Sequence, residues 1–357
     1  CHDDAERGAD DWHGADGPLG VSDLRDRHPL AVAFVEAAQQ CGHARNDDFN
    51  GAAQDGAGFY QTTTRGGLRS STAVAYLDPV RGRANLKLVC NALTTRVLFE
   101  GRRATGVEYA VNGETRRAQA NVELILAAGA INTPQLLQLS GLGPAALLQA
   151  HGVPVIADLP GVGADLNDHY FARIILRCNK PWSLNDAVRQ WHRGAAAVMR
   201  YALFRRGYFA IPALSAGCFL KAHPSSTTPD IQASLALYSV QNIVEELHAF
   251  SGVTGVCTLL RPESRGWVRL RSPDPREHPA IMPNYLATRG DQETIVAGMR
   301  VARRIAAQEP MRRYIAEETI PGLAHESDEE LLAVARRNGT TIFHPTSTCR
   351  MGPEGDA

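Results

Sequence analysis

The chain has 357 residues, of which 44% are hydrophobic and 21% charged, and its formal net charge at pH 7 is -1. This length is too great for one compact core, so it predicts about two domains, and the composition is that of a folded protein rather than a disordered one. Because the net charge is close to zero, the chain as a whole creates no field that attracts nucleic acid. We therefore expect no nucleic-acid partner.

Cysteine usage and hydropathy exclude further classes of protein. The cysteines are odd in number, widely spaced and never in a CxxC pair: Cys1, Cys41, Cys90, Cys178, Cys218, Cys257 and Cys349. Such a set fits neither a disulfide framework nor a structural zinc site, so we expect no metal. No apolar run is long enough for a transmembrane segment, and the first residues, CHDDAERGADDWHG, are too acidic for a signal peptide. We expect a cytoplasmic protein, with peripheral association to a membrane left open.

The first half of the chain predicts one helix followed by short strands. Residues 28–43 place apolar side chains at helical spacing, with Pro29 suited to the first turn. Residues 85–130 are β-prone, and Asn112-Gly113 predicts a two-residue hairpin turn, because a type I′ turn needs positive φ at both central positions. The apolar run Leu124–Leu126 predicts a strand that is buried on both faces.

The second half predicts further helices and a strand. Pro134 is expected to open a helix that Gly141 closes, and residues 266–275 alternate apolar and basic side chains like a half-exposed strand. A second amphipathic helix is indicated by five apolar residues at helical spacing: Ile295, Met299, Ala302, Ile305 and Ala306. Residues 224–229, PSSTTP, predict a surface loop. The order of elements indicates a mixed α/β protein.

The residues alone do not define a complete active site. The sequence GVGADL at 161–166 lacks the third glycine and the preceding strand of a nucleotide loop, so tight turns are the better interpretation. A GxSxG nucleophile motif is absent. A Cys/His pair of Cys349 and His344 is conceivable, although nothing local indicates an activated thiol. We interpret Asp168 and His169 as a structural pair that ties a loop to the body of the protein.

Several segments resemble one known family. Residues 127–144, AAGAINTPQLLQLSGLGP, resemble the second sequence signature of the glucose-methanol-choline (GMC) oxidoreductases, flavoproteins that oxidise alcohols. Further segments follow the family in the same order, at residues 48–88, 158–169, 261–275, 283–286 and 343–352. The resemblance covers essentially the whole chain, and it is greatest to the branch of bacterial choline dehydrogenase and related alcohol dehydrogenases.

This resemblance implies a two-domain flavoprotein fold. Residues 1–65 and 141–346 would form a substrate domain, an antiparallel sheet that carries helices. Residues 66–140 would form part of a Rossmann-like FAD-binding domain, and residues 347–357 would begin its C-terminal segment. Family members also carry an N-terminal GxGxxG turn and a second catalytic His or Asn beyond CRMG, and neither is in this sequence. We therefore expect an internal fragment that is inactive and colourless by itself.

The resemblance also assigns functional residues. His344 matches the first catalytic histidine of the family, beside flavin N5 and the substrate hydroxyl. The backbone of Thr94 matches the position at the adenine of FAD, and Ala128 and Gly129 match a position near its ADP part. Most family members have glycine where this chain has Ser347, so the backbone of that loop is a point of departure.

The implied activity is oxidation of a primary alcohol, such as choline, to the aldehyde by hydride transfer to FAD, with His344 assisting proton removal. The electron acceptor would be dioxygen or a quinone-type compound. Two alternatives stay open: a non-catalytic remnant of the substrate domain, and a hydroxynitrile lyase of the kind that some family members became. The sequence does not identify the alcohol, the acceptor or the oligomeric state.

Overall fold

The computed structural model describes residues 3–223, 225–241 and 246–353, and the chain in it divides into two compact units. Unit 1 comprises residues 1–86, 170–261 and 290–340, and unit 2 comprises residues 87–169, 262–289 and 341–357. The domain boundaries expected from the resemblance lie at residues 65, 140 and 346, and the assignment of flavin and substrate roles to the two units stays a prediction.

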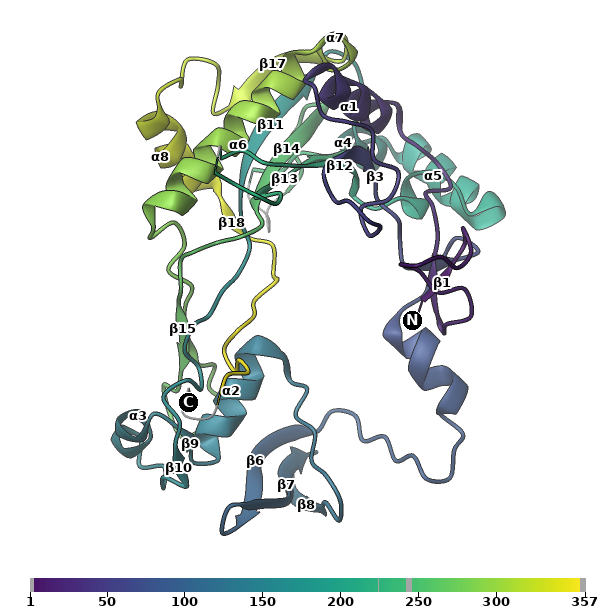
Figure 1. The fold of residues 1–357 in the computed structure, drawn as a ribbon. Coiled ribbons are helices and arrows are strands. Elements are labelled where there is room, and N and C mark those ends of the chain that lie inside the picture. Colours follow the sequence, from purple (N-terminus) through teal and green to yellow (C-terminus); the bar gives the residue numbers. More distant parts are fainter. Residues whose placement is uncertain (1–2, 224, 242–245, 354–357) are drawn as a thin grey trace. The chain divides into compact units, whose positions relative to one another are not determined.

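Unit 1 contains most of the regular structure (Figure 1). Its strands are β1 (Asp3–Ala5), β2 (Leu19–Val21), β3 (Gly56–Phe59), β4 (Thr64–Arg65), β5 (Leu68–Arg69), β11 (Tyr170–Cys178), β12 (Leu214–Leu220), β13 (Ile231–Ala236), β14 (Gly252–Leu259), β17 (Ile315–Ile320) and β18 (Thr340–Thr341). Its helices are α1 (Pro29–Gln40), η1 (Ala73–Leu77), η2 (Asp78–Val80), α4 (Leu184–Arg189), α5 (Trp191–Phe204), η3 (Tyr208–Ala210), α6 (Arg289–Ala307), α7 (Glu309–Arg312) and α8 (Asp328–Asn338).

A large antiparallel sheet forms the core of unit 1. Its strands follow the order β17-β11-β14-β13-β12-β3, and neighbouring strands in this order run antiparallel. Every residue of β14 is buried, and Arg177 is the one exposed residue of β11. Strands buried in this way are covered on both faces, so the sheet is the interior of the unit rather than a half-solvated surface.

The two amphipathic helices expected from the sequence pack on this sheet. In α1, His28 accepts a hydrogen bond from the amide of Leu30, which caps the helix, and Pro29 occupies the first turn. In α6, the apolar face is buried as predicted, and Gly298 lies against Ile231 of β13. Both predicted helices are therefore confirmed.

Unit 2 contains shorter elements (Figure 1). They are β6 (Leu93–Glu100), β7 (Arg103–Val111), β8 (Glu114–Gln119), α2 (Gly129–Leu139), β9 (Leu142–Gly143), α3 (Ala145–Ala150), β10 (Ala157–Asp158), β15 (Trp267–Arg269) and β16 (Ala280–Met282). The strands β6, β7 and β8 form a three-stranded meander, in which Asn112 and Gly113 have φ of 51° and 81°. The predicted type I′ hairpin turn is confirmed.

The strand predicted at Leu124–Leu126 is wrong. Residues 122–128 form no strand, and Val122 and Ile125 are 95% and 77% exposed. A strand that is buried on both faces needs hydrogen-bonded neighbours, and no strand of the described residues pairs with this segment.

The predicted start of the next helix is also wrong, because α2 begins at Gly129 and contains Pro134. Proline has no amide hydrogen, so the carbonyl of Ala130, four residues earlier, loses its helical partner. The hydroxyl of Thr348 donates to that carbonyl at 2.6 Å, and the Thr348 side chain is buried. A distant residue therefore supplies the hydrogen bond that Pro134 removes, which a local sequence pattern does not reveal.

The glycine-rich segment at 161–166 is a packing element. Gly163 has φ of 86°, and a Cβ there would lie 2.1 Å from the carbonyl oxygen of Val268. The buried amide of Gln138 donates to the carbonyls of Val162 and Val268 and accepts from the amide of Leu270. The glycine thus permits close backbone approach between the segment at 161–166 and the predicted strand around Val268, which is confirmed as β15.

The expected fold class, a mixed α/β protein with a large antiparallel sheet, is confirmed. Parallel pairing joins β1 to β2 and β9 to β10, and an isolated parallel bridge joins Arg45 to Ala57. None of the helices described is both long and apolar enough to cross a bilayer. The predicted loop at 224–229 lies between β12 and β13, and its first residue is outside the described residues.

Candidate active site

Asp168 is the centre of a polar cluster that holds the segment around His344 in unit 2. The carboxylate is 8% exposed. Its Oδ1 accepts the backbone amide of His344 at 3.0 Å, and its Oδ2 accepts the hydroxyl of Thr341 at 2.5 Å and that of Tyr285. Sequence interpretation gave Asp168 a structural role, but it did not foresee that the bound segment carries the candidate catalytic residue.

Backbone contacts hold the same two segments in register. Asn167 and Thr346 exchange backbone hydrogen bonds of 3.2 and 2.8 Å, and the amide of Ile342 donates to the carbonyl of His169 at 3.3 Å. The side chain of Asn167 also donates to the carbonyl of Pro262 at 2.9 Å. Residues 341–346 are therefore fixed on both sides of His344, although they form almost no regular structure.

The imidazole of His344 is exposed and lies near a second histidine. The ring centroids of His169 and His344 are 5.6 Å apart, with the ring planes inclined by 59°. Among the described residues, the ring nitrogens of His344 form no hydrogen bond, and its fixed backbone leaves the imidazole open to an incoming group. An imidazole in this situation can accept a proton from a hydroxyl.

The turn after His344 requires an unusual backbone. Ser347 has φ of 74°, which is the left-handed region that favours glycine. The resemblance implied glycine at this position, and the backbone here has a conformation that favours glycine although a serine side chain is present.

Cys349 does not behave as an activated nucleophile. Partial burial raises the pKa of its thiol above the ordinary value, which favours the protonated form at neutral pH. No hydrogen bond links Cys349 to His344 among the described residues. The geometry therefore gives no support to a Cys/His catalytic pair.

A separate cavity of unit 2, of about 670 Å³, is lined by two of the three residues expected to contact FAD. Thr94 lies on β6, an edge strand that has β7 on one side and no described strand on the other. Ala128 lies at the start of α2, and Arg276 and His278 complete another wall. The part played by residues 275–278 was not predicted, because their sequence reads only as a turn.

The start of α2 offers uncapped backbone amides. Ala128 is the N-cap residue and provides no capping side chain, and Gly129 follows it with φ of 78°. Free amides at a helix N-terminus attract groups with oxygen acceptors or negative charge. Ala128 and Gly129 are both exposed, so a ligand can approach this backbone closely.

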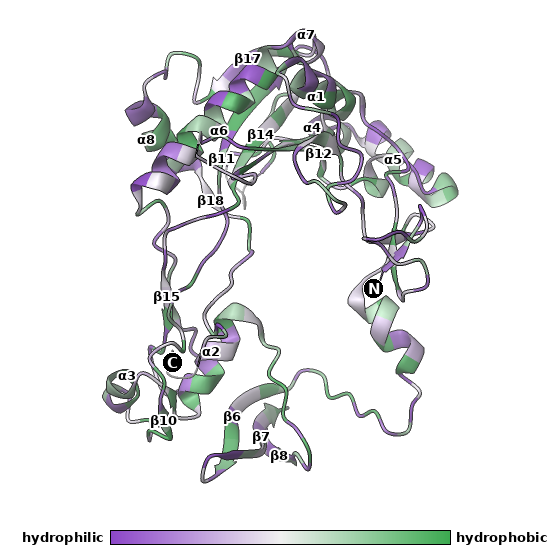
Figure 2. Cartoon of the chain, in the orientation of Figure 1, coloured by the Kyte–Doolittle hydropathy of each residue, from purple (hydrophilic) through white to green (hydrophobic). Residues whose placement is uncertain are grey.

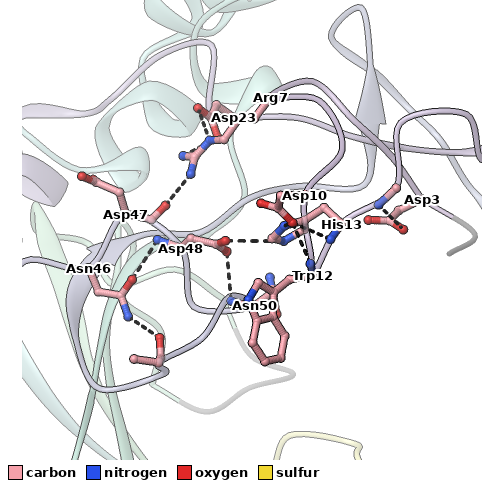
Figure 3. A network of polar contacts seen from close by, with 12 residues as sticks. Asp3, Arg7, Asp10, Trp12, His13, Asp23, Asn46, Asp47, Asp48 and Asn50 are labelled. Atoms are coloured by element: carbon pink, nitrogen blue, oxygen red, sulfur yellow. Dashed lines mark hydrogen bonds and ion pairs between the residues drawn. The ribbon is translucent and has the colours of Figure 1, made fainter.

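A second polar cluster, in unit 1, joins the N-terminal segment to the loop at Asp48 (Figure 3). Ligand atoms of Asp10, His13 and Asp48 lie within 4.8 Å of one another. The Nδ1 of His13 is 2.9 Å from Asp10, and its Nε2 is 3.5 Å from Asp48. The imidazole thus bridges two carboxylates and ties the N-terminal segment to the loop at Asp48, so we interpret the cluster as structural.

Family models agree with this architecture. A GMC oxidoreductase N-terminal model matches residues 2–171, and a GMC oxidoreductase C-terminal model matches residues 262–357. The first match includes the segment with Thr94, Ala128 and Gly129, and the second includes His344.

Curated relatives are choline and alcohol dehydrogenases. The chain is 40% identical to the mitochondrial choline dehydrogenase of Homo sapiens over 354 residues, which cover 98% of this chain and 59% of that protein. It is 38% identical to the alcohol dehydrogenase [acceptor] of Pseudomonas putida over 346 residues, which cover 96% of this chain and 62% of that protein. An oxygen-dependent choline dehydrogenase of Pseudomonas putida is 40% identical over 355 residues, which cover 97% of this chain and 62% of that protein. The chain thus spans about 60% of the length of these relatives.

Solved structures share the fold. Pyridoxine 4-oxidase from Mesorbium loti aligns with a TM-score of 0.87 and 27% identity, over 99% of this chain and 66% of that one. An Aspergillus oryzae RIB40 formate oxidase, studied for FAD modification, aligns with a TM-score of 0.89 and 23% identity, over 98% and 67%. The second likeness shows the fold alone.

Proposed function

Because the chain belongs to the GMC oxidoreductase family, we propose that it forms part of an FAD-dependent enzyme that oxidises a primary alcohol to the aldehyde. The substrate class follows from the names of the relatives, which are choline and alcohol dehydrogenases. FAD, when bound, would supply the two-electron acceptor for the hydride of the carbinol carbon. The hydroxyl oxygen loses its proton and the carbinol carbon loses the hydride. These two losses together convert the alcohol to the aldehyde.

The residues of the unit 2 cavity fit FAD. Thr94 offers the backbone of an edge strand to the adenine, and the uncapped amides after Ala128 suit the ADP part. A cavity of about 670 Å³ lies within the range for small-molecule and cofactor sites. The small residues Ala128 and Gly129 allow the cofactor to come close to the backbone.

His344 takes the hydroxyl proton in this proposal. Its imidazole is exposed and forms no hydrogen bond among the described residues, while Asp168 holds its backbone. Proton removal raises electron density on the alcohol oxygen and so eases departure of the hydride. The single observation that carries the proposal is the state of His344, in the segment that the family model matches: Asp168 holds its backbone, while its imidazole forms no hydrogen bond among the described residues.

The test is anaerobic mixing of the flavin-loaded protein with choline and with simple primary alcohols, followed by the visible absorbance of the flavin. Bleaching with formation of the aldehyde is the expected result. Cleavage of a cyanohydrin without bleaching would identify a lyase instead, and failure of the whole enzyme of which this chain forms part to bind FAD would identify a non-catalytic remnant.

Two further expectations belong to the same proposal. The 357-residue chain alone should be colourless, which gel filtration followed by a visible spectrum checks directly. The electron acceptor is dioxygen or a quinone-type compound, and oxygen consumption during turnover distinguishes the two. A cytoplasmic location, with peripheral membrane association left open, completes the proposal.

A further inference from the structure

Helix α5 contains both hydrophobic and hydrophilic residues (Figure 2), and none of its residues is buried. Trp191 is 83% exposed and Leu203 is 69% exposed, and Met199 between them is 62% exposed. Monomeric proteins seldom leave several large apolar side chains of one helix in water, and a grouped set of this kind marks an interaction surface.

Most of the exposed apolar residues of α5 lie on one side of the helix, whereas Phe204, which is 64% exposed, lies on the other. They occur at spacings of 4, 7, 8, 11 and 12 residues from the first, which brings them onto one face: Trp191, Ala195, Val198, Met199, Ala202 and Leu203. We call this set the α5 stripe. Each of its members is exposed.

The opposite side of α5 faces unit 1. Tyr201 donates from its hydroxyl to the carbonyl of Gly67 at 3.3 Å, and Arg200 pairs with Asp26 at 3.4 Å. Arg193 and Arg200 line a cavity of about 540 Å³ in the same unit. The helix is therefore held on its polar side, and the α5 stripe points away from these contacts.

The helix lies in a strongly basic stretch of the chain. Between Asp186 and Asp230 there is no acidic residue, whereas the same stretch contains five arginines and a lysine: Arg189, Arg193, Arg200, Arg205, Arg206 and Lys221. Arg189 and Arg206 flank the helix, and both are exposed. A helix with an apolar face and arginines around it is typical of segments that lie in the interface of an anionic bilayer.

We propose that α5 is a membrane-surface helix, with the α5 stripe inserted at the headgroup boundary of an anionic bilayer and the flanking arginines paired with lipid phosphates. A second copy of the chain fits less well, because a symmetric contact through the α5 stripe would bring the arginines of both copies together. The proposal extends the expectation of peripheral membrane association and does not depend on the flavin reaction.

The test is flotation of the purified protein with vesicles of phosphatidylcholine alone and with vesicles that contain a quarter phosphatidylglycerol. Binding should be strong only to the anionic vesicles and should weaken as salt is added, because salt screens the arginines. Fluorescence of Trp191, isolated as the difference between the parent and Trp191→Phe, should shift to shorter wavelength and be quenched by brominated lipid.

Matched variants make the assignment specific. Leu203→Gln should lower partitioning about tenfold, while Leu323→Gln, at a leucine 66% exposed elsewhere in unit 1, should leave it unchanged. The double variant Arg189→Gln, Arg206→Gln should lower it by about tenfold or more, and Arg336→Gln, Arg337→Gln on α8 is the control with equal charge change.

Two outcomes would overturn the proposal. One is binding to anionic vesicles that the α5 variants leave intact. The other is the absence of vesicle binding together with a dimer that Leu203→Gln dissociates in size-exclusion chromatography with light scattering. Neither result depends on flavin content or on turnover, so failure here is distinct from failure of the proposed catalysis.

Discussion

The carboxylate of Asp168 accepts the backbone amide of His344 at 3.0 Å, so a buried charge fixes the position of an exposed imidazole 176 residues away in the chain. The same carboxylate accepts the hydroxyls of Thr341 and Tyr285. One residue therefore organises the segment that precedes the imidazole and the backbone of His344 itself.

Replacement of Asp168 by Ala should destabilise the protein by about 1 to 3 kcal/mol, because the hydrogen-bond donors that it satisfies would lose their acceptor. It should also slow flavin reduction, since His344 loses its anchor. Chemical denaturation and anaerobic reduction measure the two effects. Asp165→Asn, in the same loop at a side chain 43% exposed, is the control and should change stability by less than about 1 kcal/mol, because asparagine tolerates the left-handed backbone there, where φ is 55°. Loss of turnover with unchanged stability would show that Asp168 takes part in chemistry rather than in positioning.

Replacement of Thr348 by Val should cost about 1 to 3 kcal/mol of unfolding free energy. Valine keeps the shape of threonine but removes the donor to the Ala130 carbonyl, which Pro134 has already left without its helical partner. Thr346→Val, at an exposed hydroxyl in the same segment, should cost distinctly less. Equal losses of unfolding free energy for the two variants would mean that the Thr348 hydrogen bond stabilises the protein no more than the exposed hydroxyl of Thr346 does.

Replacement of Ser347 by Gly should leave stability unchanged or raise it by up to about 1 kcal/mol. Glycine relieves the left-handed strain at φ of 74°, although it also gains entropy in the unfolded chain. Ser347→Val should instead lower the melting temperature clearly, because a β-branched residue tolerates this conformation poorly. If the valine variant were as stable as the parent, the inference that the backbone at Ser347 is strained would be wrong.

Acid should destabilise unit 1 through His28. Burial lowers the pKa of His28 to about 4 from the usual 6.5, so the folded state binds fewer protons than the unfolded state between these values. The stability contribution is complete above about pH 6.5 and falls as the pH drops to about 4, by at most about 3 kcal/mol. His28→Asn keeps a capping acceptor for α1 and removes the titration, so its stability should fall less over this range. If the unfolding free energies of parent and variant fell by the same amount over this pH range, the loss of stability in acid would not be due to His28.

Local patterns predicted what depends on near neighbours in the chain. The hairpin at Asn112-Gly113 and the helices α1 and α6 follow from turn geometry and from spacing of apolar residues, which the sequence displays directly. The strand expected at Leu124–Leu126 failed because a buried strand is defined by its partners. The start of α2 was placed five residues late because Thr348 satisfies the carbonyl that Pro134 leaves open.

The candidate site was predicted by resemblance and positioned by contacts that span the chain. His344 and the segment 343–352 were identified from the sequence, but the link from Asp168 to His344 joins residues that no local pattern connects. The basic surface of α5 was also missed, because a net charge of -1 averages over a stretch with no acidic residue between Asp186 and Asp230.

The central claim is that His344 assists removal of the hydroxyl proton, and anaerobic stopped-flow reduction of the flavin tests it most directly, because it observes the chemical step without reoxidation. His344→Ala should retain FAD and slow reduction by roughly 10²- to 10⁴-fold, the usual contribution of one positioned acid-base group. Cys349→Ser should stay within a few-fold of the parent, because its thiol has no part in hydride transfer. If the cysteine variant loses reduction while the histidine variant keeps it, His344 is not the catalytic group.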